Sequence, residues 1–304
     1  MTTTLTQEQQ TATSAPGPAA AVGPSAAAHP AAARTTPEPS AGRRLANAAG
    51  SVVWKSTAVL AFLALWELGP TYLASPSTKV FLPPLHEVLA AWARLFEAGT
   101  IQGHITASLT RSVAGFGAAL VAGVALGLLI AWYGRLNSVL NPLLELFRNT
   151  AALALLPVFT LLLGIGEESK ISIVAYAAFF PVLLNTIAGV KTVDPLLIRA
   201  ARSLGLGSFR LFQKVILPSA VPTIFTGIRM AGTASILVLI AAEMVGAKAG
   251  LGYLIVNAQS SFLIPDMYAG ILTVSLLGLA VNFLLVALER HFSRWRTAVG
   301  SAAS

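Results

Sequence analysis

The chain of 304 residues contains no cysteine, and only 11% of its residues are charged, against about 25% in soluble domains. The missing thiols exclude disulfides, thiolate zinc sites, iron–sulfur ligation and cysteine nucleophiles. Its 4 histidines lack the spacing of metal ligands, and the sequence has neither a phosphate-binding Gly-rich loop nor a nucleophile elbow. We therefore expect no enzyme, no metal site and no cofactor in this chain.

Apolar residues are abundant instead, making up 55% of the chain. One soluble core could not hide that much apolar surface, so lipid must be the solvent for much of it. Apolar stretches of about 20 residues, the length of a helix that crosses a bilayer, predict six spans at residues 52–73, 112–133, 140–166, 171–190, 221–245 and 267–288. The predicted fold class is an all-α polytopic membrane protein.

The chain divides by composition into three parts. Residues 1–50 are rich in Ala, Pro, Thr and Ser and predict a disordered tail, because such a segment buries too little apolar surface to become ordered. Residues 51–296 form the predicted membrane domain, and 297–304 a short C-terminal tail. Between the first two spans, the amphipathic stretch 85–96 predicts a short helix lying on the membrane surface.

The positive charges predict the orientation. With the N-terminus inside, cytoplasmic segments hold 13 Lys and Arg residues, and the outer side holds 4, namely Lys79, Arg94, Lys170 and Lys248. This asymmetry follows the positive-inside rule, and an even number of spans places both termini in the cytoplasm. Because the basic residues follow the sides of the membrane, they indicate topology, and we expect no nucleic-acid partner.

The polar segment 191–218 joins the fourth and fifth predicted spans on the cytoplasmic side. Asp194 followed by Pro195 is typical of a helix start, and Gly205 is placed to close that helix in the left-handed conformation. We expect Ser208 to cap a second helix and Pro218 to end it before the fifth span. An amphipathic loop resting on lipid headgroups is the alternative interpretation of this segment.

The frame of small and apolar residues in this segment resembles the EAA loop of ABC-importer permeases. That frame consists of Ala200, Ala201, Gly205, Val215, Leu217 and Pro218. The leading Glu of the family is replaced by Arg199 in this chain. The resemblance implies a coupling helix, the element that docks in a groove of a cytoplasmic ATPase subunit.

Other motifs are similar to the branch of these permeases that carries nitrate, sulfonate, taurine and bicarbonate. They are Ser108–Phe116, Gly164–Lys170, Phe179–Asn185, Gly227–Ala231, Ala241–Gly246 and Gly250–Tyr253. Two positions depart from the family pattern, with Ala151 in place of a Pro and Asn282 in place of an Asp. The missing Pro predicts a less kinked third span.

The resemblance implies the permease subunit of an ABC importer in a bacterial cell membrane, moving a small solute such as a sulfonate, taurine or nitrate. It implies a homodimer, a cytoplasmic ATPase dimer that binds ATP and Mg, and an extracytoplasmic solute-binding protein. The alternatives are an ion-coupled secondary transporter and a membrane assembly protein that transports nothing. A secondary transporter would show inverted repeats, and the sequence shows no internal repeat.

Four ionisable residues fall within or at the ends of the predicted spans: Arg111, Arg148, Arg229 and Glu243. A charge at bilayer depth usually faces a water-filled path or a partner. One interpretation is that all four line the translocation path, with Glu243 at an outer gate and Arg111 and Arg148 meeting an anionic solute. The alternatives are pairing of Arg229 and Glu243 with charges on neighbouring spans, with Arg111, Arg148 and Glu145 as candidates, and arginines that extend to the membrane surface.

Overall fold

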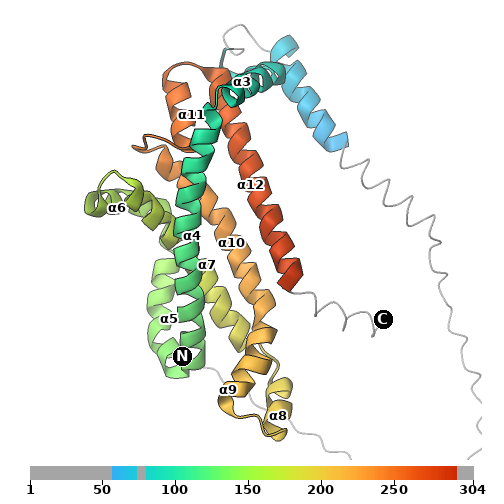
Figure 1. The fold of residues 1–304 in the computed structure, drawn as a ribbon, viewed down its shortest axis with the longest axis vertical. Helices are drawn as coiled ribbons and strands as arrows, with labels where there is room; N and C mark the ends of the chain where they lie inside the picture. The colour runs from blue at the N-terminus through green and yellow to red at the C-terminus, as the bar shows by residue number, and fades with distance from the viewer. Residues whose placement is uncertain (1–56, 74–79, 293–304) are drawn as a thin grey trace, which may run out of the picture. The chain divides into compact units, whose positions relative to one another are not determined.

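The computed structural model describes residues 57–73 and 80–292, all of which belong to one compact unit, Thr57–Ser304. The predicted tails at 1–50 and 297–304, and the first residues of the first predicted span, lie outside the described residues. Within the described ranges every regular element is a helix (Figure 1). The predicted all-α class is therefore confirmed.

The helices follow one another with short connections. A helix over 57–68 leads into the π turn η1 (Gly69–Leu73). The next elements are α3 (Leu85–Glu97), α4 (Thr100–Trp132), α5 (Gly134–Arg148), η2 (Ala152–Leu155), α6 (Leu156–Leu163), α7 (Glu167–Lys191), α8 (Pro195–Ser203), α9 (Ser208–Leu211), η3 (Phe212–Ile216), α10 (Leu217–Glu243), α11 (Leu251–Ser260) and α12 (Ile264–Phe292).

Four helical segments of the described chain are long and apolar enough to cross a membrane: α4, α7, Ser208–Glu243 and α12. Counting the bent pair formed by α5 with residues 152–163 as one span raises the number to five. The structure therefore contains four or five candidate spans, and the predicted count of six is not confirmed.

The expectation of a less kinked third span is wrong. Gly134–Arg148 and Ala152–Leu163 meet at an angle of 85°, although Ala151 stands where a proline was expected. The side chains of Asn149 and Thr150 bond back to the carbonyls of Glu145 and Leu146, at 2.8 and 3.2 Å. The helix ends here without a proline; bonds of the same kind occur inside continuous helices at Thr106 and Thr186, so they do not by themselves explain the bend.

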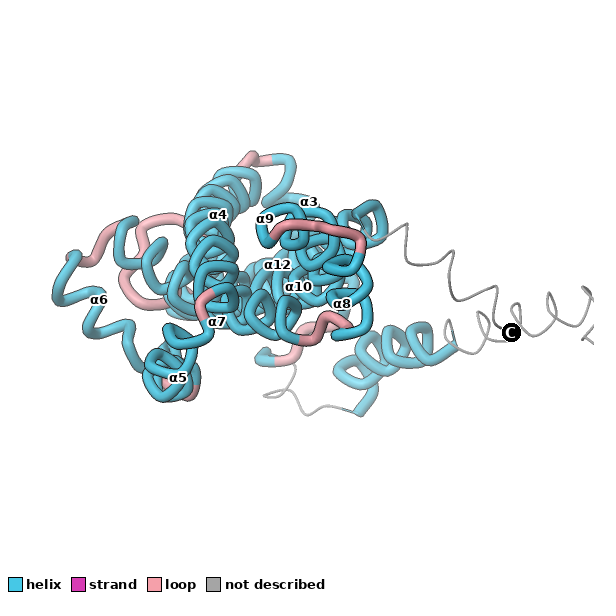
Figure 2. Tube along the Cα trace, turned by 90° about the horizontal axis from the view of Figure 1, so that it is seen from below, coloured by secondary structure: helices cyan, strands magenta, loops and turns pink. Residues whose placement is uncertain are grey.

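Helices α4, α7 and α10 form the centre of the bundle, with α7 packed against both of the others (Figures 1 and 2). Glycines allow the close approach of α4: a Cβ added to Gly127 would lie 2.7 Å from Thr186 Cβ, and one added to Gly123 would lie 2.9 Å from Val182 Cγ1. Ala119, Ala178, Val182 and Ala231 are buried there. The Gly-x-x-x-Gly motif of α4 therefore serves packing within the chain.

Helices α3, α11 and α12 gather at the upper end of the bundle in Figure 1. The predicted helix at 85–96 is present as α3 and packs on α12, where Trp92 Nε1 donates to Thr273 Oγ1 at 3.1 Å and Arg94 pairs with Asp266. Sequence reasoning did not anticipate α11.

At the opposite end, residues 194–218 form a bent segment, the elbow, made of α8, α9 and η3. The predicted start is confirmed, because Asp194 Oδ1 accepts a hydrogen bond from Leu196 N at 2.7 Å. Gly205 has a φ of 78°, the left-handed conformation that glycine adopts without strain.

Two details of the predicted elbow are wrong. Gly207, and not Ser208, precedes α9 as its N-cap, and no side chain caps this helix. Pro218 does not end the second helix, because the π turn η3 continues directly into α10. A proline ring clashes with the carbonyl four residues earlier in a regular helix, and the wider π turn changes that register before Pro218.

Candidate functional site

The elbow exposes large apolar side chains beyond the end of the bundle. Leu204 is 80% exposed, Phe209 75%, Leu196 64% and Leu197 51%. The predicted coupling residues Ala200 and Gly205 are exposed beside them, Ala201 is buried, and Val215, Leu217 and Pro218 are partly buried where the chain enters α10. A cluster of exposed apolar side chains marks an interaction surface.

The elbow is also attached sideways to the bundle. The ring of Phe212 in η3 packs edge-on against Trp132 at the end of α4, with 4.9 Å between ring centroids. This contact links the elbow to a second long helix besides α10, into which it runs directly.

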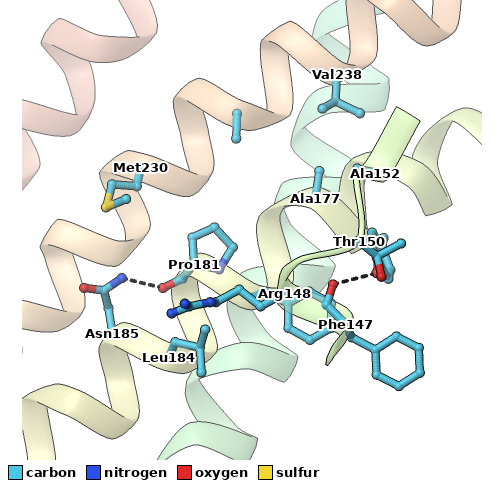
Figure 3. Close-up of a pocket in the computed structure, with 13 residues that line it drawn as sticks. Phe147, Arg148, Thr150, Ala152, Ala177, Pro181, Leu184, Asn185, Met230 and Val238 are labelled. Carbon is cyan, nitrogen blue, oxygen red and sulfur yellow. Dashed lines mark hydrogen bonds between the residues drawn. The ribbon is translucent and has the colours of Figure 1, made fainter. Parts of the chain in front are cut away.

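A cavity of about 390 Å³ lies where the broken segment after α5 meets α7 and α10 (Figure 3). Its volume is within the range of small-molecule sites, about 300–1,000 Å³. The lining residues are Phe147, Arg148, Thr150, Ala152, Tyr176, Ala177, Phe180, Pro181, Leu184, Asn185, Met230, Ala234 and Val238. Most of the wall is apolar, and Arg148 is its one charged member.

Arg148 reaches into this cavity toward Pro181 and Asn185. Its side chain is 52% exposed, and its one ion pair joins Nη2 to Glu145 Oε2 at 3.2 Å. Among the described residues, no acceptor bonds to Nε or Nη1. Nε and Nη1 lie on different edges of the guanidinium, so each of them can donate a single hydrogen bond to an oxyanion.

Arg111 and Glu243 are in direct contact at the other end of the bundle. The two side chains are 4% and 0% exposed, and Arg111 Nη1 lies 2.7 Å from Glu243 Oε1. Arg111 also donates from Nη1 to Ala249 O at 2.7 Å, and from Nε and Nη2 to the carboxylate of Glu167, with 2.6 Å for the Nη2 bond.

The remaining bonds of Glu243 fix the start of α11. Glu243 accepts from Ser108 Oγ, which lies 2.8 Å from each carboxylate oxygen, and from Gly252 N at 3.0 Å. Ser108 Oγ in turn accepts from Leu251 N at 2.9 Å. We call Ser108, Arg111, Glu167 and Glu243 the buried ion cluster, of which Glu167, at the edge, is 62% exposed. The cluster ties α4, α7, α10 and α11 together.

The four predicted path residues are not gathered in one place. Arg111 and Glu243 share the buried ion cluster, and Arg148 lines the cavity. Arg229 pairs with Glu289 of α12, with 3.2 Å between Nη1 and Oε2. A role of these residues in translocation stays a prediction.

Sequence reasoning gave no individual role to Ser108, Glu167 or Asn185, although all three lie in motifs that it singled out. The partners of Ser108 and Glu167 are distant in the chain, since 135 residues separate Ser108 from Glu243 and 56 separate Arg111 from Glu167. Asn185 donates to Pro181 O, four residues earlier. The available signal was the rarity of charge, which makes every acidic residue near a span a candidate partner for an arginine.

The architecture is an all-helical bundle with several candidate spans and the elbow at one end. The fold is similar to the solved structure titled as inward facing conformations of the MetNI methionine ABC transporter, with a TM-score of 0.54 at 19% identity. That match covers 63% of this chain and 95% of that chain. At this identity the likeness concerns the fold.

Sequence comparison identifies the family. Residues 123–297 match the family described as binding-protein-dependent transport system inner membrane component. The chain belongs to this family of ABC transporter permeases, whose members are membrane components and not themselves enzymes.

Three relatives carry the names of solutes. The chain is 35% identical to the taurine transport system permease protein TauC of Escherichia coli, over 76% of this chain and 84% of that one. It is 35% identical to SsuC of Escherichia coli, named for aliphatic sulfonates transport, over 78% and 89%. It is 30% identical to the bicarbonate transport system permease protein CmpB of Synechococcus elongatus, over 78% and 87%.

Proposed function

We propose that this chain is the permease subunit of an ABC importer that moves a small oxyanion, such as a sulfonate, taurine or nitrate, using ATP hydrolysed by a separate subunit. The names of three relatives support this solute class, since taurine, aliphatic sulfonates and bicarbonate all carry an anionic group of two or three oxygens. The half-exposed guanidinium of Arg148 in the cavity supports the same class.

The observation that carries the proposal is the elbow. It presents Leu204 and Phe209, 80% and 75% exposed, on a segment whose basic residues favour the cytoplasmic side. Large apolar side chains on a water-exposed segment favour a protein partner. The partner of the proposed importer is an ATPase dimer, which binds ATP and Mg and grips residues 194–218.

The proposed assembly contains two copies of the chain, with the solute path along their two-fold axis, and a solute-binding protein at the outer face. Both termini lie in the cytoplasm. Closure of the ATPase pair on ATP moves the two elbows together, and this rigid-body shift opens the path outward. Arg148 lies along the path, whereas the burial of Arg111 and Glu243 supports a packing role for that pair.

The first measurement is copurification. The tagged chain is purified in detergent from the membranes of cells that also produce its ATPase and binding protein. We expect an ABC-type ATPase, identified by mass spectrometry, to remain with the wild type, and the variant Leu204→Asp/Phe209→Asp to lose it. Retention of the ATPase by the double variant would contradict docking at the elbow.

Uptake of radiolabelled taurine, an alkanesulfonate and nitrate by whole cells is the second measurement. Gly205→Glu should abolish uptake while the protein stays inserted, because a charge then stands in the docking surface. Gly205→Asn is the matched control, since Asn tolerates the left-handed conformation, and it should keep most uptake. Uptake that depends on a sodium or proton gradient and does not depend on ATP would favour the secondary transporter.

A further inference from the structure

The elbow carries positive charge that the chain itself does not neutralise, and this charge bears on which partner the elbow takes. The inference rests on the proposed function. Residues 194–218 contain four basic residues, namely Arg199, Arg202, Arg210 and Lys214, and all four are exposed. Within the part of the chain that the structure describes, none of their side chains forms an ion pair or a hydrogen bond.

The one acidic residue of the elbow is already engaged. Asp194 accepts a hydrogen bond from Leu196 N through Oδ1, at 2.7 Å, and so caps α8. The arginines of the bundle differ from those of the elbow, because Arg94, Arg148 and Arg229 each pair with a carboxylate of the chain. The elbow therefore keeps a net positive charge, which favours an acidic partner.

Arg199 lies beside the exposed apolar surface of α8. A helix turns once every 3.6 residues or about that, so Leu196 and Arg199 both lie on the side of α8 opposite to its buried residue, Ala201. Arg202 stands three residues further along, next to Arg199 on the helix surface. Leu196 is 64% exposed, and a partner that covers it therefore covers Arg199 as well.

Covering Arg199 removes water from a guanidinium group. A charge that loses its water without gaining a partner of opposite charge destabilises a complex, so a protein that docks here has to supply acceptors. The positive-inside rule accounts for basic residues in a cytoplasmic segment but not for their position on one face. The helix dipole favours Arg202 in the last turn of α8, whereas Arg199 lies outside that turn.

We propose that the elbow binds an ATPase whose docking groove is apolar at its centre and carries carboxylates where it meets Arg199 and Arg202. The apolar centre covers Leu204 and Phe209, and the carboxylates accept from the two guanidinium groups. An ATPase with a basic groove is rejected, because it brings like charges together. Charge thus determines which ATPase this permease takes.

The absence of cysteine from the chain allows the charge at one position to be set chemically. The thiol of Arg199→Cys reacts with methanethiosulfonate reagents that attach either a trimethylammonioethyl group, which is positive, or a sulfonatoethyl group, which is negative. The modified permease, in phosphatidylcholine nanodiscs, is then titrated with the ATPase that copurifies with the wild type, purified separately. We expect the positive adduct to bind at least tenfold more tightly than the negative one, and equal affinities would overturn the proposal.

Arg290→Cys, modified in the same way, is the matched control. Arg290 is an exposed basic residue near the end of α12, outside the elbow, and its two adducts should bind the ATPase within twofold of each other. A charge effect as large as that at Arg199 would overturn the proposal, because it would reflect the overall charge of the chain.

The salt dependence of binding is a second measurement that needs no chemical modification. Raising NaCl from about 0.05 M to about 0.5 M screens charges and should weaken wild-type binding at least tenfold. The double variant Arg199→Gln/Arg202→Gln should bind more weakly at low salt and lose severalfold less on the same change. An equal response of both proteins would overturn the proposal.

An anionic bilayer is the other surface that fits a basic and apolar segment. We expect phosphatidylglycerol in the nanodisc to leave the reaction of N-ethylmaleimide with Arg199→Cys within twofold of its rate in phosphatidylcholine. Protection by phosphatidylglycerol without the ATPase would place the elbow on lipid and overturn the inference. A wild-type chain that binds no ATPase would contradict the proposed function itself, whereas an ATPase that binds the wild type and both adducts equally would overturn only this inference.

Discussion

Arg111 and Arg148 differ in almost every physical respect. Arg111 is 4% exposed, and its Nε, Nη1 and Nη2 atoms all donate to acceptors of the protein. Arg148 is 52% exposed and holds one neighbouring carboxylate through one nitrogen. A buried and fully bonded charge stabilises a single arrangement of helices, whereas a half-exposed charge with unused donors can bind something else.

The difference in exposure and hydrogen bonding indicates a structural role for Arg111 and a ligand-binding role for Arg148. Both arginines look alike in the sequence, since each lies near an end of an apolar stretch. Stability measurements and transport measurements should therefore diverge between the two regions, and four variants of decreasing expected effect on stability test this divergence.

Glu243→Ala should have the largest effect. The substitution leaves Arg111 buried beside an empty space and removes the acceptor of Ser108 and Gly252. Breaking one member of a buried pair costs about 3–5 kcal/mol. We expect the thermal unfolding temperature in detergent and the yield of inserted protein to fall sharply. The double variant Arg111→Met/Glu243→Leu should be less damaging, and equal damage would argue against a structural pair.

Ser108→Ala should have the next largest effect. It leaves Leu251 N without its acceptor and removes one donor from Glu243, whose carboxylate keeps Arg111 and Gly252. An unsatisfied buried polar group costs about 1–3 kcal/mol. Hydrogen exchange should show faster opening at the start of α11. Ser138→Ala is the control, because Ser138 is a surface residue that bonds only back to Gly134 O. Similar losses for both would contradict the cluster.

Glu167→Gln should be milder. Glu167 is 62% exposed, so solvent screens its attraction to Arg111, and exposed pairs contribute about 0–1 kcal/mol. We expect a small fall in unfolding temperature that shrinks further at high salt. A loss as large as that of Glu243→Ala would show that the two carboxylates of the cluster are equivalent.

Arg148→Gln should leave stability nearly unchanged, within about 0.5 kcal/mol, as for surface substitutions. Uptake of an alkanesulfonate by whole cells should nonetheless fall at least tenfold. A stable protein with little transport would contrast with Glu243→Ala, for which we expect a large loss of stability. A strong loss of stability in Arg148→Gln would remove the distinction between the two regions.

The sequence predicts the features that depend on nearby residues. Apolar stretches indicated α7 and α12 closely, because a bilayer demands about 20 apolar residues whatever the neighbours. The cap at Asp194 and the left-handed turn at Gly205 were also predictable, since each depends on local backbone groups.

Features that depend on distant residues were predicted only as one alternative among several, or not at all. The pairing of Glu243 with Arg111, which lies 132 residues away, was one of three candidate pairings, because no local pattern singles out a distant partner. The 85° bend near Thr150 was not predicted, because only a proline was considered as a cause of bending. Pro218 was wrongly predicted to end a helix. The π turn before it accommodates the proline ring, and the helix continues.

That continuity has a mechanical consequence. From Ser208 to Glu243 the chain forms 36 residues of helix, with the elbow at one end and the carboxylate that holds α11 at the other. A force on Phe209 therefore passes directly into this helix, and Glu243 fixes the far end in place. Such a rod pivots, so a small displacement of the elbow becomes a tilt along the whole length of α10.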